Sequence, residues 1–229
     1  RSMKLALLAD VHSNLEALRA CLDHAAEQGA DRHVFVGDLV GYGADPVAVL
    51  EAVQSHLEKG AVVVQGNHDA AVDGSTEGMN AAAADAIVWT RRQLGERQRA
   101  FLSGLPMLLR CENAVFVHGS AAAPEKWTYV SDPLRAAASL RAAAASYVFC
   151  GHVHEPILYY TGAAARPVSF RPVPGKPIPV PPYRHWLAVV GSAGQPRDGN
   201  TAACYAMFDD ARSSLTFHRV PYDWAEAAR

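Results

Sequence analysis

The sequence has few of the features that mark several large protein classes. Its four cysteines, in a chain of 229 residues, are far apart and form no CxxC pair, which predicts buried, reduced thiols rather than a disulfide framework. No apolar run approaches the ~18 residues of a membrane-spanning helix. The formal net charge is −2. We therefore expect neither a membrane partner nor the dense basic surface that nucleic-acid binding requires.

The composition favours a single soluble domain. Hydrophobic residues make up 50% of the chain, which is enough for one substantial core, and we predict one domain over residues 1–229. Arg1 and Ser2 resemble a cloning remnant ahead of Met3, and the first strand-like run follows almost at once. We therefore expect no signal peptide and a cytoplasmic location.

Strands and helices alternate over the first two-thirds of the chain. Apolar runs predict strands at residues 5–9, 33–36, 61–65, 114–117 and 147–150. Helical spacing of apolar residues, with caps and breakers at the ends, predicts helices at residues 14–28, 45–58, 81–94, 96–102 and 131–145. Such alternation is typical of a largely parallel sheet with right-handed crossovers.

The final third has a different pattern. Strand-like runs at residues 157–161, 186–190, 202–209 and 214–220 are joined by turn signals such as Asp198-Gly199-Asn200, which favours hairpins. Because proline donates no backbone hydrogen bond, the Pro-rich stretch 166–182 is expected to form an extended surface excursion. The whole predicts two packed sheets with helices outside.

Five polar blocks follow predicted strands at the point where each apolar run stops. They are Asp10-Val11-His12, Gly37-Asp38, Gly66-Asn67-His68-Asp69, His118 and Gly151-His152-Val153-His154. Ligands of open α/β sheets bind just beyond the carboxyl ends of the strands. The first block also places an Asp and a His two residues apart, so that in extended backbone both point to one side and can chelate one ion.

The donor types in these blocks indicate a catalytic metal centre. Carboxylate, amide carbonyl and imidazole groups, with no thiol, suit divalent manganese, iron, cobalt, nickel or zinc, whereas structural zinc normally uses cysteine. Each block alone has a simpler explanation: Asp-x-His is common, Gly-Asp is often a turn, and a lone histidine is usually a satisfied side chain. The five blocks together, all at strand ends, favour a pair of metal ions.

In this order the blocks resemble the calcineurin-like metallophosphoesterase superfamily, whose pattern is D-x-H, GD, GNH[D/E], H and GHxH. The runs VGDLVGYGADP, HGS and GSAGQPRDGN are also similar to its small bacterial branch of predicted phosphodiesterases. The resemblance extends from Lys4 to Asp223. It implies an α/β (α+β) fold built as a four-layer sandwich, in which two mixed β-sheets pack face to face with helices on both outer sides.

The resemblance also implies a role for each matched residue. Two divalent metal ions (Mn, Fe, Zn, Ni or Co) would be held by Asp10, His12 and His154 on one side and by Asn67, His118 and His152 on the other, with Asp38 bridging. His68 would be no ligand but would stand beside the scissile phosphate, and Asp69 would orient the site or cap the turn. A metal-bridging hydroxide would attack phosphorus in line, and His68 would donate a proton to the departing alkoxide.

One departure from the superfamily pattern narrows the class of substrate that we expect. Its serine/threonine protein phosphatases carry GDxVDRG, whereas Gly41 and Tyr42 stand here in place of the Asp that supports the catalytic histidine and the Arg that grips phosphate. This argues against a protein phosphatase. Asn14 and Tyr42 are then candidates for lining the substrate site, the alternatives being helix capping for Asn14 and loop packing for Tyr42. Arg197 either approaches an anionic substrate or braces a turn.

The leading hypothesis is a phosphoric ester hydrolase that acts on a small phosphodiester. A phosphomonoesterase or a dinucleoside polyphosphate hydrolase would use the same metal centre, because specificity lies in the loops around it. A different class of function is a metal-binding scaffold, as in a retromer subunit of this fold that lacks the catalytic histidine. His68 and a full ligand set favour the enzyme.

Overall fold

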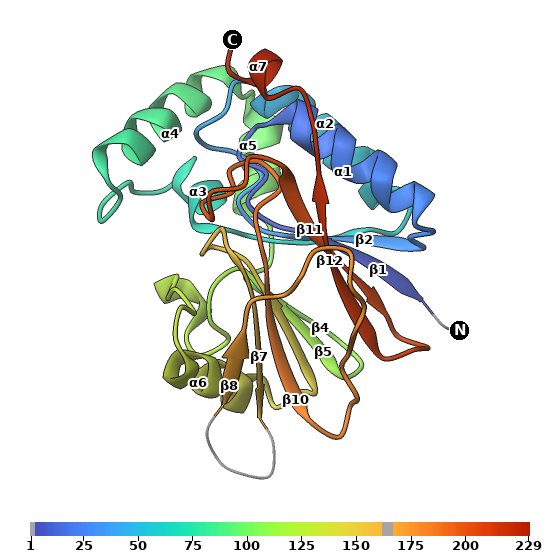
Figure 1. Ribbon diagram of the computed structural model, residues 1–229. Coiled ribbons are helices and arrows are strands. Elements are labelled where there is room, and N and C mark those ends of the chain that lie inside the picture. The colour runs from blue at the N-terminus through green and yellow to red at the C-terminus, as the bar shows by residue number, and fades with distance from the viewer. Residues whose placement is uncertain (1–2, 162–166) are drawn as a thin grey trace.

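The structure is a computed structural model that describes residues 3–161 and 167–229 (Figure 1). Two six-stranded mixed sheets pack against each other. The first sheet has the order β3-β2-β1-β11-β12-β9, and its strands are Val62–Val64, Arg32–Val36, Lys4–Leu8, Ala203–Asp209, Ser214–Val220 and Ile178–Pro179. The second sheet has the order β4-β5-β6-β10-β7-β8, and its strands are Leu108–Cys111, Ala114–Val117, Tyr147–Cys150, His185–Val190, Pro156–Thr161 and Val168–Phe170.

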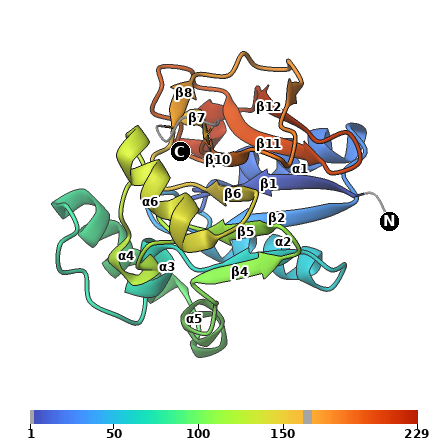
Figure 2. The same ribbon diagram turned by 90° about the horizontal axis from the view of Figure 1, so that it is seen from below.

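Helices cover both outer faces, which completes the predicted four-layer sandwich. Four helices, α1, α2, α4 and α5, lie on the outer face of the first sheet, at Leu15–Glu27, Pro46–Leu57, Ala81–Gln93 and Glu96–Ser103. The outer face of the second sheet packs against α6 (Pro133–Ala143), which crosses it in the view of Figure 2. Of two short helices, α3 (Asn67–Ala71) follows β3, and α7 (Trp224–Ala227) lies near the C-terminus. Within the described residues no helix has the length and hydropathy to cross a membrane.

The alternation of side chains along β1 explains why its sequence is a continuous apolar run. Leu5 and Leu7 face the second sheet and belong to the core between the sheets, whereas Ala6 and Leu8 face the opposite way and pack in the core under the outer helices. Successive side chains of a strand point to opposite faces. A strand with a core on each side therefore needs apolar residues at every position.

The parallel strands are divided between the two sheets, whereas the sequence pattern favoured one largely parallel sheet followed by hairpins. Strands β1, β2 and β3 are parallel in the first sheet, while β5, β6 and β10 are parallel in the second. The turn at Asp198-Gly199-Asn200 was expected to close a hairpin, but it leads from β10 to β11, which belong to different sheets. The expected hairpin between β11 and β12 is present.

Two further expectations are corrected. The Pro-rich stretch was predicted to lie outside any sheet, but within its described residues, 167–182, it forms the short edge strands β8 and β9. Proline is tolerated at sheet edges because one side of an edge strand pairs with no neighbour. Cys111 is exposed, whereas the other three cysteines are buried as predicted; all four are free thiols.

Candidate metal centre

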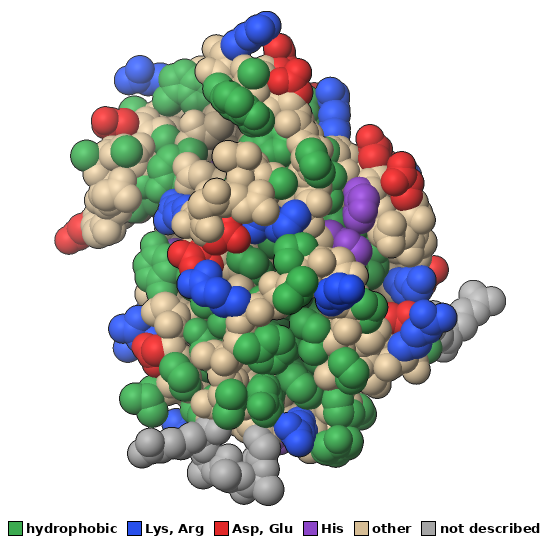
Figure 3. All heavy atoms as spheres, in the orientation of Figure 1, with side chains coloured by type: hydrophobic (Ala, Val, Ile, Leu, Met, Phe, Trp, Pro, Cys, Tyr) green, Lys and Arg blue, Asp and Glu red, His purple; other side chains and the backbone are tan. Residues whose placement is uncertain are grey.

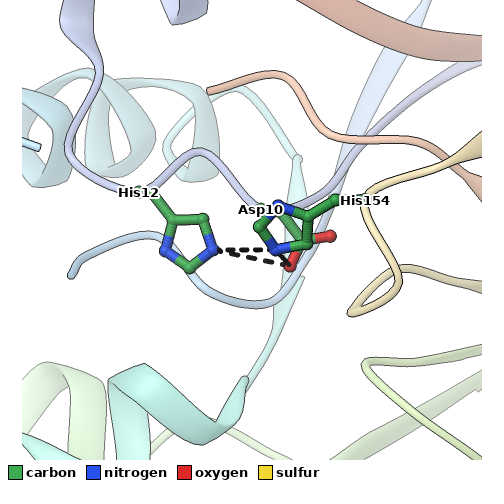
Figure 4. Close-up of side chains that lie close together, drawn as sticks. All are labelled: Asp10, His12 and His154. Atoms are coloured by element: carbon green, nitrogen blue, oxygen red, sulfur yellow. Dashed lines mark hydrogen bonds and ion pairs between the residues drawn. The ribbon is translucent and has the colours of Figure 1, made fainter. Parts of the chain in front are cut away.

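The five polar blocks meet at one edge of the sandwich, and both sheets contribute. The loops after β1 and β2 carry Asp10, His12 and Asp38, and the helix α3 after β3 begins with Asn67. The loops after β5 and β6 carry His118, His152 and His154. Figure 4 shows how side chains from the β1 and β6 loops point at one another. Parallel strands end at the same edge of a sheet, so residues far apart in sequence converge there.

The backbone of these loops is held in an unusual conformation. Five of the residues, Asp10, His12, Asp38, His152 and His154, have positive φ between 48° and 70°. This left-handed region costs of order 1–3 kcal/mol for a residue with a side chain, and such strain persists only where the surroundings impose it. Here the loops bond to one another: the backbone N–H groups of Asp10 and His12 donate to Gly37 and Asp38, both at 3.0 Å.

The first group of possible ligand atoms comes from Asp10, His12 and His154, all buried. His154 Nε2 lies 3.3 Å from Asp10 Oδ1, and His12 Nε2 lies 3.8 Å from the same oxygen. The two imidazole Nε2 atoms are 3.2 Å apart. Two nitrogens and one carboxylate oxygen therefore face a common point, as three ligands of one ion would.

Asp38 stands at the centre of two further groups, one with His12 and His68 and the other with His118 and His152. Its Oδ2 lies 3.2 Å from His118 Nε2 and 3.7 Å from His12 Nε2. Because one carboxylate reaches histidines of both neighbouring groups, Asp38 is positioned to be shared between two ions.

Backbone carbonyls orient each histidine of the cluster. The Nδ1 atoms of His12, His118 and His154 lie 3.0, 2.8 and 2.6 Å from the carbonyl oxygens of Val40, Val36 and Gln195. For His152 it is Nε2 that lies 2.8 Å from the Trp127 carbonyl. A nitrogen that donates to a carbonyl leaves the other ring nitrogen with its lone pair facing the cluster, which is the usual arrangement around a metal-binding histidine.

Several buried atoms of the cluster lack a hydrogen-bond partner among the described residues. They include Asp10 Oδ1, Asn67 Oδ1 and His118 Nε2. Unsatisfied buried polar atoms are costly and call for a physical explanation, such as an ion. Asp10 Oδ1 and His118 Nε2 lie 3.8 Å apart, and carboxylate, amide and imidazole donors of this kind fit divalent cations.

The charges in the cluster reinforce this interpretation. Burial alone would raise the pKa of Asp10, but His154 and His118 lower it to about 2. Burial would also raise the pKa of Asp38, which its histidine neighbours, His118 foremost, hold well below its usual value. Burial would lower the pKa of His118, yet Asp38 and Asp10 raise it to about 10. Two buried carboxylates thus remain ionised and attract positive charge.

The comparisons with known proteins identify the chain. Residues 3–212 match the model described as the calcineurin-like phosphoesterase superfamily domain. The chain belongs to this superfamily. It is 33% identical to a metallophosphoesterase from Sphaerobacter thermophilus, whose crystal structure matches with a TM-score of 0.86 over 99% of this chain and 91% of that one.

Two other proteins extend the comparison. The uncharacterized protein MJ0912 of Methanocaldococcus jannaschii is 31% identical over 234 residues, which cover 97% of this chain and 89% of that protein. The hypothetical protein PH1004 of Pyrococcus horikoshii OT3 is 19% identical and shares the fold, with a TM-score of 0.76 over 98% of this chain and 90% of that chain. The chain is a metallophosphoesterase with a buried His/Asp cluster consistent with a dinuclear metal site, and its family implies a phosphoester substrate.

In this metallophosphoesterase His68 lies beside the cluster rather than within its carbonyl-anchored set. It is the second residue of α3, its backbone N–H donates to Asp38 Oδ1 at 2.8 Å, and its Nε2 lies 4.0 Å from Asp38 Oδ2. A Cβ added to Gly41, whose φ is +92°, would overlap His68 Nδ1. The glycine that replaces the protein-phosphatase aspartate is therefore required for this position of the histidine.

Asp69, the neighbour of His68, ties two of the metallophosphoesterase loops together. Its carboxylate is fully buried and accepts hydrogen bonds from the backbone N–H groups of Asp38, Leu39 and Gly66, each at 2.9 Å. It both caps the turn and holds the loop that carries Asp38. The two roles considered from the sequence are thus combined in one side chain.

The two candidate substrate residues lie next to the cluster. Asn14 caps α1 by accepting the Ala17 N–H at 3.1 Å, and its amide donates to the Gly194 carbonyl at 2.9 Å. The Tyr42 ring packs edge-on against His12, with ring centroids 4.9 Å apart, and lies 4.8 Å from His68. The Arg197 guanidinium lies 5.9 Å from the centre of the Tyr42 ring. Asn14 therefore caps α1 and also lines a cavity beside His12, and Tyr42 packs on His12 and His68.

Aromatic residues after β5 were not predicted from the sequence as part of the site. Tyr129 stacks on His152 with ring centroids 3.7 Å apart and an interplanar angle of 12°. Trp127 holds His152 through its carbonyl, and its indole ring lies 6.1 Å from that of His118. Both residues lie in an irregular loop before α6, where no periodicity marks them. Their one sequence signal is that the loop follows directly from the His118 block.

Proposed function

We propose that the chain hydrolyses a phosphodiester with two divalent metal ions at this cluster. Their ligands would be Asp10, His12 and His154 for one ion and Asn67, His118 and His152 for the other, with Asp38 shared by both. Two bound divalent ions supply positive charge that neutralises phosphoryl oxygens and makes water acidic enough to act as a nucleophile near neutral pH. The observation that supports this most is the shared position of Asp38 between groups whose buried lone pairs lack partners.

The chain's own residues would do the rest of the work. His68 would donate a hydrogen bond or a proton to the oxygen of the departing ester group. It lies 4.0 Å from Asp38 and lines a cavity of about 510 Å³, through which a leaving group can reach it. Tyr129 and the Trp127 carbonyl would keep the His152 ring oriented, because stacking on one face and a hydrogen bond at Nε2 restrict its rotation.

The test compares His68→Ala with the parent protein after reconstitution with Mn²⁺, Fe²⁺, Zn²⁺, Ni²⁺ or Co²⁺. We expect the variant to keep the parent's metal content by elemental analysis and to lose about 10²–10⁴-fold in kcat on a glycerophosphodiester, whose alkoxide leaving group needs a proton. The loss on bis-p-nitrophenyl phosphate should be smaller, since p-nitrophenolate leaves without a proton. The matched control is His185→Ala, an exposed histidine outside the cluster.

Other outcomes would favour the alternatives. Faster turnover of p-nitrophenyl phosphate than of its diester would indicate a phosphomonoesterase, and turnover of a dinucleoside polyphosphate alone would indicate that hydrolase. A parent protein that takes up no metal would be a scaffold. Near-wild-type turnover by His68→Ala would contradict the role proposed for His68.

A further inference from the structure

Two separate cavities adjoin the metal centre. The larger, of about 510 Å³, is lined on the cluster side by Asn67, His68 and His152. The smaller, of about 240 Å³, includes His12 in its lining. The two sets of lining residues have only Tyr42 in common. A group bound at the cluster can therefore extend into two spaces with Tyr42 between them.

The larger cavity has a polar and partly charged lining. Lys126, Trp127 and Tyr129 form one part of it, and residues of the 75–83 segment, Glu77 among them, form another. The surface is hollowed between the protruding α4 region and the layer below it (Figure 3). Because His68 belongs to this lining, a leaving group that takes a proton from His68 would depart through this cavity.

The smaller cavity is different in character. Among the residues that line it are Tyr222 and Trp224, and none of its lining residues is Asp, Glu, Lys or Arg. Trp224 opens α7 and is 62% exposed, so that much of its indole is free of protein contact. The Asn14 amide, which also bonds to Gly194, lies 3.3 Å from the Tyr222 hydroxyl and helps to hold this wall in place. The cavity thus offers aromatic surface without charge.

The size of this cavity suits one flat group. An enclosed apolar cavity of ~150 Å³ accommodates benzene, so about 240 Å³ leaves room for a single substituted ring. A phosphodiester has two ester arms, and only one leaves. The arm that stays on phosphorus needs a space of its own, which a monoester does not require.

We propose that the smaller cavity binds the retained ester arm, that Trp224 and Tyr222 select an uncharged arm with a flat face, and that Tyr42 separates it from the leaving arm. This inference rests on the proposed diesterase function and adds the substrate class to it. In the reaction, the bond from phosphorus to the leaving arm breaks and a bond to the oxygen of water forms. The water gives up one proton, the leaving oxygen gains one, and the retained arm departs as its phosphomonoester.

The test keeps the leaving group constant and varies the retained arm. Phenyl p-nitrophenyl phosphate and methyl p-nitrophenyl phosphate both release p-nitrophenolate, so their ratio of kcat/KM reports the retained arm. In Trp224→Ala we expect the phenyl-to-methyl ratio to fall roughly 3- to 10-fold, the range expected for one lost aromatic contact. Tyr183→Ala is the matched control, because this tyrosine is 79% exposed and lines neither cavity. It should leave the ratio unchanged.

A second measurement does not depend on turnover. Phenyl phosphate and methyl phosphate are the retained-arm products, and calorimetry on the metal-loaded protein gives their affinities. Trp224→Ala should weaken the binding of phenyl phosphate roughly 3- to 10-fold more than the binding of methyl phosphate. Equal effects on both arms, or none, would overturn the inference while leaving the diesterase activity standing. Turnover of monoesters only would instead overturn the proposed function, and the inference with it.

Discussion

Five of the ten histidines, the inner set, lie at the candidate metal centre, and the other five, the outer set, lie outside it, although rings in the two sets pack at similar distances. The inner set is His12, His68, His118, His152 and His154. In the cluster the His12 and His154 rings are 4.9 Å apart and the His118 and His152 rings 4.8 Å. Outside it, His33 and His56 are 4.7 Å apart, and His24 and His218 are 4.9 Å apart. Ring spacing therefore does not distinguish a metal centre from an ordinary pair of half-buried histidines.

What differs is the charge around the rings. Within the described part of the chain, ion pairs of 4.0 Å or less join four of the inner histidines, His12, His68, His118 and His154, to Asp10 or Asp38, and none joins an outer histidine to a carboxylate. Asp38 overcomes burial at His118 and raises its pKa to about 10. At His12, His68 and His152 burial prevails and lowers the pKa, as it does at His33. Among the described residues, the ionised buried carboxylates of Asp10 and Asp38 are therefore what the inner set has and the outer set lacks.

The substitution with the largest expected effect removes the charge of Asp38 and keeps the shape of its side chain. In Asp38→Asn the side-chain oxygen that accepts the His68 N–H can remain, so we expect a folded protein. Without the shared carboxylate, metal content should fall below that of the parent, and kcat/KM on bis-p-nitrophenyl phosphate should fall by at least about 100-fold, because metal-centred catalysis requires the ions. Elemental analysis and the phosphodiester assay measure the two effects.

The control for this substitution is Asp85→Asn, which removes the charge of an exposed aspartate on α4. It should change neither metal content nor turnover. Full metal content and activity in Asp38→Asn would show that the carboxylate is dispensable and that buried negative charge is not what distinguishes the inner histidines from the outer ones.

A second prediction concerns His68, the inner histidine that is not anchored to a backbone carbonyl. In Gly41→Ala the added Cβ would overlap His68 Nδ1, whereas in Gly60→Ala the Cβ would meet nothing within 4 Å. Both glycines have φ near +90°, so each substitution should carry a similar backbone cost of ~1–2 kcal/mol, to which the overlap with His68 adds in Gly41→Ala. Displacement of His68 should lower kcat about 10- to 100-fold in Gly41→Ala alone, because general acid catalysis is worth about 10²–10⁴-fold and the ring is moved rather than removed.

Chemical unfolding and steady-state kinetics of the two variants, with metal content as a third measurement, separate the effects. Equal activity of Gly41→Ala and Gly60→Ala would mean that His68 tolerates displacement. A loss of metal in Gly41→Ala would mean that position 41 acts on the ligands rather than on His68.

The sequence allowed the strand-end residues to be predicted because their signal is local. An apolar run that stops at Asp or His is visible within a few residues, and the unbroken apolar run of β1 is typical of a strand buried on both faces. The partition of strands between sheets was not predictable in this way. Whether β10 pairs with β6 or opens a hairpin depends on packing between segments distant in the chain.

The parts of the site that escaped prediction lie in irregular segments. Trp127, Tyr129 and Trp224 line the cavities beside the cluster from a loop and from the short helix α7, where neither a strand nor a long amphipathic helix fixes the direction of a side chain. Proline likewise ruled out the interior of a sheet but not its edge, which is where β8 and β9 lie. Local patterns thus identify the ligands, and the tertiary fold determines what surrounds them.

The smallest expected effect comes from the outer set and concerns stability. The pKa of His33 is about 4 in the folded protein, against 6.5 as its ordinary value. Between these two pH values the unfolded chain binds a proton at this position and the folded chain does not, so stability present above pH 6.5 is lost as the pH falls towards 4. The groups that oppose its charge are His56 on α2 and Lys59 just beyond it, both of which disfavour protonation.

The measurement is the urea midpoint of the parent and of His33→Phe at pH 7.5 and pH 5, with the metal concentration held constant. The rest of the chain is the same in both proteins, so its contribution to the pH dependence cancels in the difference between them. We expect His33→Phe to lose less stability than the parent over this interval, because it removes one group that gains a proton on unfolding. Equal losses of stability in the two proteins would show that His33 is free to protonate in the folded state. The pair His33 and His56 would then differ from the inner set by its exposure to solvent rather than by the absence of a carboxylate.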